Sequence, residues 1–211
     1  MILSYGGICM DINNVELMEK VRKFTLASVK PSRYEHCERV AQTAMILCEL
    51  FDIHPWKGYF SGLAHDMCRD LDDQTLLSLA AHDNRPISEV EKQKPLLLHG
   101  RAAAVKLFRD FGVDDTDILQ AVARHTLGCE KMRPLAKIIF IADKIEPGRP
   151  QSNQKYREPF YTMSLDQMCL TVLDENIAYQ KSKNKPVVAQ TLAFRESLIR
   201  DIQKASNGGA Q

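Results

Sequence analysis

The sequence lacks any run of apolar residues near the roughly 18 to 20 that a membrane-spanning helix needs, so we expect neither a transmembrane segment nor a membrane partner. It also lacks an excess of one charge, because 28 Lys and Arg stand against 27 Asp and Glu in 211 residues. Without a global positive field, nucleic acid is not an expected partner either. An anionic ligand must therefore be held by local charges.

Closely spaced cysteines are missing as well. No Cys-x-x-Cys pair occurs, and the cysteines mostly fall on apolar helical faces, where a free thiol behaves as a small hydrophobe. The apolar first ten residues have no basic start and no small-residue cleavage site, so we expect no signal peptide. This pattern predicts a protein of the reducing cytoplasm. The six cysteines are Cys9, Cys37, Cys48, Cys68, Cys129 and Cys169.

Strand signals are scarce, whereas every long periodic segment repeats its apolar residues at intervals of 3 to 4. We therefore predict an all-α helical bundle in one domain, with an N-terminal extension over 1–14, the domain over 15–205 and a frayed tail over 206–211. The segment 147–159 is expected to be a surface loop. A loop is expected at 52–55, followed by a helix that carries His65 and Asp66. The other helices are expected at about 14–28, 31–51, 73–81, 95–111, 115–125, 134–145, 164–183 and 188–204.

The most informative feature present is the dipeptide His65-Asp66, which puts two strong metal ligands side by side in an apolar run. Burying an unpaired polar group costs several kcal/mol, about 2 to 7 in model systems. A hydrogen bond to a backbone carbonyl would explain any single buried histidine of the candidate set. The set also contains two buried aspartates, and one charged partner could serve only one of them. The whole set therefore predicts a metal centre. Four further candidates lie on apolar helical faces: His36, His99, His125 and Asp143.

Two other histidines lack an apolar context. The second His-Asp dipeptide, His82-Asp83, lies where a helix breaks into Asn-Arg-Pro, and His54 precedes a proline in a loop. We expect both histidines on the surface, with no part in the metal centre.

The order His, His-Asp, Asp resembles that of the HD-domain metal-dependent phosphohydrolases, a helical superfamily. The sequence is most similar to the YqeK-type bacterial branch, which hydrolyses diadenosine tetraphosphate symmetrically to two ADP. The similarity covers about residues 15 to 200. It is carried by His36-Cys-Glu-Arg39-Val, Gly62-Leu-Ala-His65-Asp66-Met-Cys-Arg69-Asp70, Leu97-Leu-His99-Gly100, Arg124-His125-Thr126-Leu-Gly128 and Phe140-Ile-Ala-Asp143-Lys-Ile-Glu146-Pro147-Gly148-Arg149.

The resemblance implies an HD-domain bundle and a symmetrical bis(5'-nucleosyl)-tetraphosphatase with a binuclear metal centre. It implies that His36, His65, Asp66 and Asp143 surround one ion, and that Asp66 bridges to a second ion held with His99 and His125. Iron is the expected metal, although nitrogen and carboxylate ligands also suit manganese or zinc. The implied partner is a small dinucleoside polyphosphate, and the sequence is compatible with a homodimer.

Two metals about 3.5 to 4 Å apart can activate a water for in-line attack on a phosphorus, and phosphoryl transfer also needs cations at the phosphates. The catalytic candidates are Asp66, Arg69 and Asp70, the last to orient Arg69 or assist proton transfer. A surface charge would explain Arg69 or Arg149 equally well, and it explains Lys144 and Arg39 better. A helix cap or a surface role would explain Asp70 equally well. The candidates for substrate binding are Arg39, Arg69, Lys144, Glu146 and Arg149.

Two other readings stay open. One keeps the metal site but changes the substrate to a nucleoside monophosphate or a cyclic dinucleotide, although no Gly-Tyr-Pro follows the later histidines. The other is a non-catalytic nucleotide-binding module that retains the metal for stability. A missing ligand would favour that module, and none of the six ligands is missing.

Overall fold

Helix α8 (Pro134–Ile145) runs through the middle of the molecule, and much of the chain packs around it. Its sequence is apolar on nearly every face, which is typical of a fully buried helix. The helix contacts α2 (Pro31–Leu50), α3 (Pro55–Ala64), α7 (Thr116–Arg124) and α10 (Leu165–Ser182). Its last turn therefore delivers Asp143 to the centre of the bundle.

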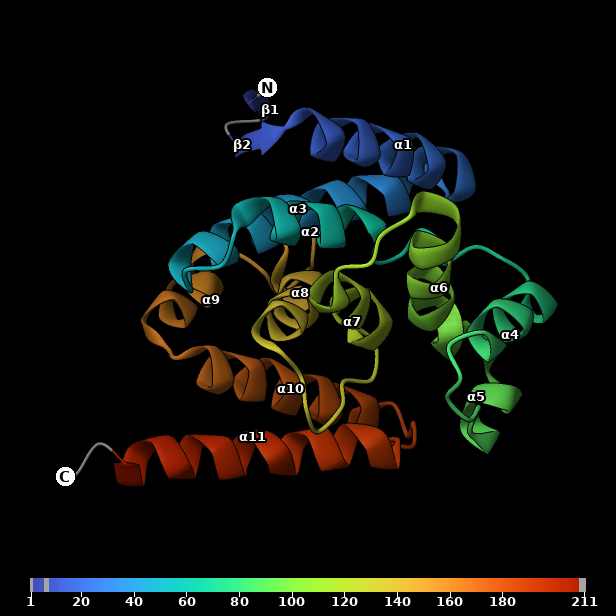
Figure 1. The fold of residues 1–211 in the computed structure, drawn as a ribbon. Coiled ribbons are helices and arrows are strands. Elements are labelled where there is room, and N and C mark those ends of the chain that lie inside the picture. The colour runs from blue at the N-terminus through green and yellow to red at the C-terminus, as the bar shows by residue number, and fades with distance from the viewer. Residues whose placement is uncertain (1, 6–7, 209–211) are drawn as a thin grey trace.

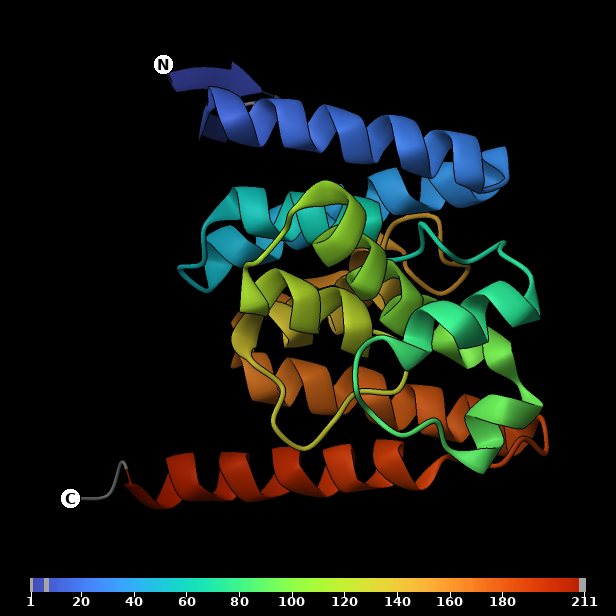
Figure 2. The ribbon, with the colours of Figure 1, turned by 45° about the vertical axis from the view of Figure 1, so that its right-hand side comes forward.

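The structure is a computed structural model that describes residues 2–5 and 8–208. Figure 1 shows α1 on one outer side above α2 and α3, a middle layer of α6, α7 and α8, and α10 and α11 on the other side. The view in Figure 2 shows the same stack, with α4 and α5 on the flank beside α6. The remaining elements are β1 (Ile2–Tyr5), β2 (Ile8–Asp11), α1 (Ile12–Ser28), α4 (Asp73–Ala81), α5 (Glu89–Gln93), the 3₁₀ turn η1 (Pro95–Leu98), α6 (His99–Phe111), α9 (Gln154–Arg157), the 3₁₀ turn η2 (Glu158–Thr162) and α11 (Ala189–Gly208).

Two glycines allow the helices that carry histidines to approach closely. A Cβ at Gly62 would lie 2.6 Å from the Cα of Ala41, so only glycine lets α3 pack so tightly on α2. A Cβ at Gly100 would lie 2.7 Å from the carbonyl oxygen of Val122, which sets α6 against α7 in the same way. These contacts bring the ends of four separate segments together.

The all-α prediction is confirmed for the helical body, and the expected helices at 73–81 and 134–145 have the observed bounds. The N-terminal extension was expected to carry no strand, but β1 and β2 form an antiparallel pair with Ile2 opposite Asp11. The sequence between them, Gly6-Gly7, is a dipeptide typical of hairpin connections, and it could have predicted this strand pair.

Several predicted boundaries were wrong. Helix α3 ends at Ala64, so His65 and Asp66 follow the helix instead of lying within it. The short α5 was not predicted, and the expected loop 147–159 contains α9 and the start of η2. The expected tail is still helical at 206–208, while residues 209–211 lie outside the described part of the chain. Among the described helices, none is both long and apolar enough to span a bilayer.

The two residues of the second His-Asp dipeptide, His82 and Asp83, lie in different surroundings. His82 is exposed, as predicted, but Asp83 is partly buried and accepts hydrogen bonds from Nε and Nη2 of Arg101, both at 2.7 Å. Arg101 also donates to Glu91 at 3.1 Å. Burial alone would raise the pKa values of both carboxyls, but their hydrogen bonds lower them, so Asp83 is a structural anchor for the loop before α5.

Replacing Arg101 should therefore destabilise the fold. Arg101→Met should lower the free energy of unfolding by about 3 kcal/mol, because the buried Glu91 loses its cation and Asp83 keeps only Arg85. Arg109→Met on the exposed side of the same helix should change it by less than about 0.5 kcal/mol. Urea denaturation measures both.

The same contacts make the stability of the fold depend on pH. Asp83 and Glu91 have lowered folded pKa values, so their stabilisation is present above their unfolded pKa values, about 4, and is lost as the pH falls through the folded ones. Arg101→Met should therefore show a smaller loss of stability on acidification than the parent. Equal effects of Arg101→Met and Arg109→Met would contradict this account.

Candidate metal centre

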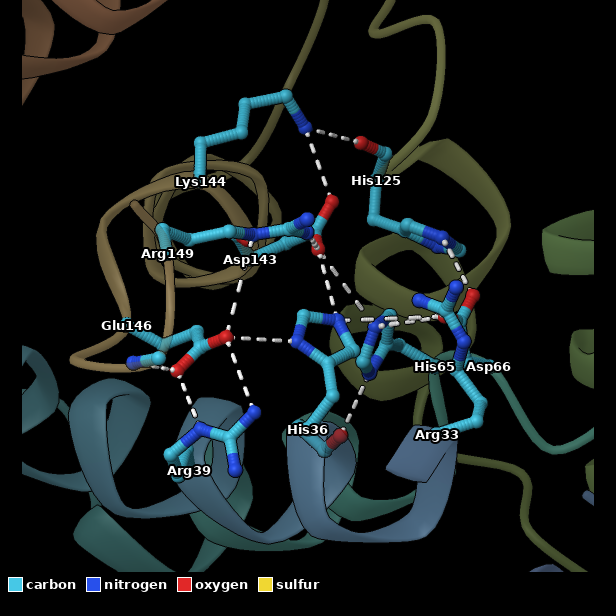
Figure 3. Close-up of polar contacts among 12 residues, drawn as sticks. Arg33, His36, Arg39, His65, Asp66, His125, Asp143, Lys144, Glu146 and Arg149 are labelled. Carbon is cyan, nitrogen blue, oxygen red and sulfur yellow. Dashed lines mark hydrogen bonds and ion pairs between the residues drawn. The ribbon is translucent and has the colours of Figure 1, made fainter. Parts of the chain in front are cut away.

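Four imidazoles and two carboxylates from five segments converge in the middle of the bundle, and Figure 3 shows His36, His65, His125, Asp66 and Asp143 among them. His36 lies in the second turn of α2, His65 and Asp66 directly follow α3, and His99 is the first residue of α6. His125 directly follows α7, and Asp143 lies in the last turn of α8. The four histidines and Asp66 are all buried. The structure therefore brings together all six residues that the sequence predicted as metal ligands.

Asp66 lies between two pairs of histidines. Its Oδ2 atom is 3.5 Å from His65 Nε2 and 4.0 Å from His36 Nε2. Its Oδ1 atom is 2.9 Å from His99 Nε2 and 3.5 Å from His125 Nε2. Two groups of donor atoms result, one with His36, His65 and Asp66 and the other with Asp66, His99 and His125, and the atoms of each group lie within 4.8 Å of one another.

Each of these four histidines uses its Nδ1 atom outside the cluster. Three rings can donate Nδ1–H to a backbone carbonyl three residues earlier, and the fourth donates to a glutamate. Such outer contacts fix the tautomer and turn Nε2 toward a shared centre, as is usual for histidines that bind metals. The pairs are His65 with Gly62 O at 2.6 Å, His99 with Leu96 O at 2.6 Å, His125 with Val122 O at 2.7 Å and His36 with Glu146 Oε1 at 3.0 Å.

His65 provides a direct test of whether a metal fits here. Its side chain is completely buried, and its Nε2 atom has no hydrogen-bond partner among the described residues. Burial lowers the pKa of His65 to about 3, so the ring is neutral and Nε2 carries a lone pair. A buried acceptor without a donor is costly, and a metal ion satisfies it. The mixed imidazole and carboxylate donor set suits a first-row transition metal.

Both aspartates stay ionised in spite of their burial. Burial would raise the pKa of Asp66, but the surrounding imidazoles, His65 first and then His125 and His99, hold it well below its ordinary value. Burial would likewise raise the pKa of Asp143, but Lys144, His36 and Arg149 lower it strongly. Both groups are therefore available as anionic ligands.

A cation lies next to each of the two carboxylates (Figure 3). Lys144 Nζ lies 3.1 Å from Asp143 Oδ2, and Arg149 donates from Nη2 to Asp143 Oδ1 at 2.5 Å. Arg33 Nη1 lies 3.0 Å from Asp66 Oδ2. About a third of the Arg33 and Arg149 side chains is exposed, so both guanidinium groups can also face a ligand that arrives from solvent.

Comparison with known proteins agrees with this arrangement. The model of the HD domain matches residues 33–148, which is more than half of the chain and includes all six residues. The chain belongs to the HD-domain family.

Relatives of this HD-domain protein share most of its length. It is 31% identical over 185 residues to the symmetrical bis(5'-nucleosyl)-tetraphosphatase of Halalkalibacterium halodurans, covering 82% of this chain and 95% of that protein. It is 33% identical over 132 residues to the Staphylococcus aureus protein of the same name, covering 63% and 68%. The crystal structure of a protein from Clostridium acetobutylicum, described as a predicted HD superfamily hydrolase involved in NAD metabolism, matches with a TM-score of 0.80 and 27% identity, covering 87% of this chain and 97% of that chain.

Sequence reasoning missed two side chains at the centre of this HD domain. Arg33 precedes His36 by one helical turn, and that spacing was a usable signal. Thr126 Oγ1 lies 3.2 Å from His125 Nε2 and 3.4 Å from His99 Nε2. Because Thr126 follows the end of α7, no periodicity could have placed it.

The predictions for Glu146 and Arg39 need correction. Glu146 is almost completely buried and binds His36 Nδ1, so it positions a ligand and does not lie at the mouth of the site for substrate. Arg39 donates to Glu146 from Nε at 2.6 Å, and the backbone N–H of Gly148 donates to the same carboxylate at 2.5 Å. These contacts offset the burial and lower the pKa of Glu146 to about 2. Arg39 therefore neutralises Glu146 in the fold.

Asp70 makes a contact that the sequence did not predict, and its part in proton transfer stays a prediction. Asp70 is exposed, and its Oδ2 accepts a hydrogen bond from the backbone N–H of Lys30 at 2.9 Å, directly before α2. This hydrogen bond holds the turn between α1 and α2, and Asp70 does not orient Arg69. Arg69 Nη1 lies 3.2 Å from His99 Nδ1, but that nitrogen is engaged by a carbonyl, so the guanidinium is a neighbour of the centre without a bond to it. Phosphate binding by Arg69 and Lys144 stays a prediction.

The position of Glu146 behind His36 leads to a prediction about metal affinity. Glu146→Gln keeps the shape but removes the charge that orients and polarises the His36 ring. We expect affinity for Mn²⁺ to fall by about ten- to a hundred-fold, the usual effect of losing such a partner. Competition with a chelating dye measures it.

The matched control is Glu35→Gln, which removes an exposed carboxylate at 4.0 Å from the same Arg39. It should leave metal affinity unchanged. If both variants bind Mn²⁺ like the parent, Glu146 does not support the metal centre.

Proposed function

We propose that this protein is a metal-dependent hydrolase that cleaves diadenosine tetraphosphate symmetrically to two ADP. The observation that carries the proposal is the placement of Asp66, whose two oxygens face two separate pairs of imidazoles. The relatives that share most of the chain bear the name of this activity. The similarity to the Halalkalibacterium halodurans protein extends over 185 residues and not only over the short His-Asp motif.

The residues that would hold the ions form two sets joined by Asp66. His36, His65 and Asp143 complete one set with Asp66, and His99 and His125 complete the other. A bound metal pair supplies an activated water and positive charge for phosphate oxygens. We propose iron as the native metal, with manganese or zinc as substitutes, because the ligand set suits all three.

The chain itself supplies the cations that a polyphosphate needs. Arg33 lies next to Asp66, and Lys144 and Arg149 lie next to Asp143. A guanidinium has five N–H donors and cannot coordinate a metal, so Arg33 and Arg149 have donors to offer phosphate oxygens. They would orient the phosphate chain for in-line attack, and positioning of this kind provides most of the catalysis in phosphoryl transfer.

Symmetrical cleavage defines the bonds that change. The oxygen of one water bonds to the phosphorus second from one adenosine, and the bond from this phosphorus to the central bridging oxygen breaks. The leaving group is ADP, and the attacked half becomes the second ADP after losing the proton of water.

We also propose that the protein works in the reducing cytoplasm, in keeping with its buried thiols at Cys37, Cys48, Cys68 and Cys169.

The products test this reaction directly. The metal-loaded protein should convert diadenosine tetraphosphate to ADP alone, as separated by chromatography. In ¹⁸O-labelled water, one of the two ADP molecules should carry the label on its terminal phosphate. ATP plus AMP, or label on AMP, would contradict symmetrical attack.

The two His-Asp dipeptides provide a matched pair of variants. Asp66→Ala should remove most bound metal and most activity, because it deletes the carboxylate shared by both sets. His82→Ala should change neither, since His82 is exposed at the end of α4. Elemental analysis and the ADP assay measure both variants. Loss of metal in His82→Ala, or full metal in Asp66→Ala, would show that the wrong dipeptide was chosen.

A further inference from the structure

A second cavity lies on the outer side of α6 and α7, next to the loop that follows α4. Its volume is about 800 Å³, which is within the range of small-molecule sites, about 300 to 1,000 Å³. One wall is apolar and includes Val105, Phe108, Leu119 and Ala123. The ring of Phe108 is 58% exposed, which is unusual for so large an apolar side chain beside a cavity.

This cavity is separate from the metal centre. None of the six candidate metal ligands lines it. Arg124 lines the cavity, whereas the next residue, His125, is buried among the other imidazoles. Successive side chains around a helix point about 100° apart, so α7 presents one face to each site.

Positive charge on the cavity wall is largely uncompensated. The wall contains Arg85, Arg109, Arg124 and Lys131 but only one acidic side chain, Asp83, and that carboxylate is held by Arg85 and Arg101. The side chains of Arg109, Arg124 and Lys131 form no hydrogen bond or ion pair with any residue that the structure describes. Arg124 is also half-buried, where a lone guanidinium gains most from an anion.

We propose that this cavity is a second binding site, for an organic phosphate that carries an aromatic ring, as nucleoside phosphates do. The guanidinium groups match the geometry of phosphate oxygens, and the exposed ring of Phe108 offers a face for stacking. The site goes beyond the proposed hydrolysis, because binding there requires neither the metal ligands nor cleavage. Its test can therefore fail or succeed independently of the activity.

Cys129 gives a local readout, since its half-buried thiol lines the cavity. The rate of Cys129 alkylation by iodoacetamide is measured in the full-length, metal-loaded protein by peptide mass spectrometry, with ADP, adenosine or inorganic phosphate as the probe. ADP should slow alkylation several-fold at concentrations where adenosine and phosphate have little effect. Equal protection by phosphate would overturn the role of the apolar wall, and equal protection by adenosine would overturn the role of the arginines. No protection by ADP would overturn the site.

Two variants locate the binding. Arg124→Gln should raise the ADP concentration needed for protection by about ten- to a hundred-fold, the effect of one lost charge-assisted contact. Lys204→Gln removes an exposed charge on α11 and should change nothing. If Arg124→Gln does not fold, as judged by circular dichroism, the double variant of the exposed Arg109→Gln and Lys131→Gln serves the same purpose. Unchanged protection in a folded variant would overturn the proposal.

Discussion

The buried carboxylate of Asp66 is the group on which the rest of the structure depends. Four imidazole Nε2 atoms lie within 4.0 Å of its two oxygens, and they come from segments that are far apart in the sequence. Without a cation between them, this arrangement would leave His65 Nε2 without a partner. Polar groups of the surrounding chain keep these rings in place: three backbone carbonyls and the Glu146 carboxylate accept hydrogen bonds from the Nδ1 atoms.

The packing of the bundle serves this geometry. Gly62 and Gly100 let α3 approach α2 and α6 approach α7, so that the rings of His36 and His65 lie 5.3 Å apart and those of His99 and His125 lie 4.8 Å apart. Three of the six ligands lie directly after a helix, where the backbone can turn a side chain inward without breaking helical hydrogen bonds. The mostly apolar α8 then closes the bundle and carries Asp143 on its last turn.

The sequence was informative where a periodic pattern controlled the structure. Apolar spacing placed His36, His99 and Asp143 on inward faces, and it separated the buried dipeptide His65-Asp66 from the exposed His82. It failed for Glu146 and Asp70, because their contacts depend on which atom of a distant segment lies opposite. That atom is the Nδ1 of a ring 110 positions away for Glu146 and the N–H of Lys30 for Asp70. Arg33 was missed because a charged residue in a first turn is normally solvated. Its contact with Asp66 arises only from tertiary packing.

The most direct test of the account is a crystal structure of the metal-loaded protein with anomalous data collected at the absorption edge of the bound metal. The account predicts two anomalous peaks flanking Asp66, one beside Oδ2 near His36, His65 and Asp143 and the other beside Oδ1 near His99 and His125. A single peak, two peaks on the same carboxylate oxygen, or peaks away from Asp66 would contradict it.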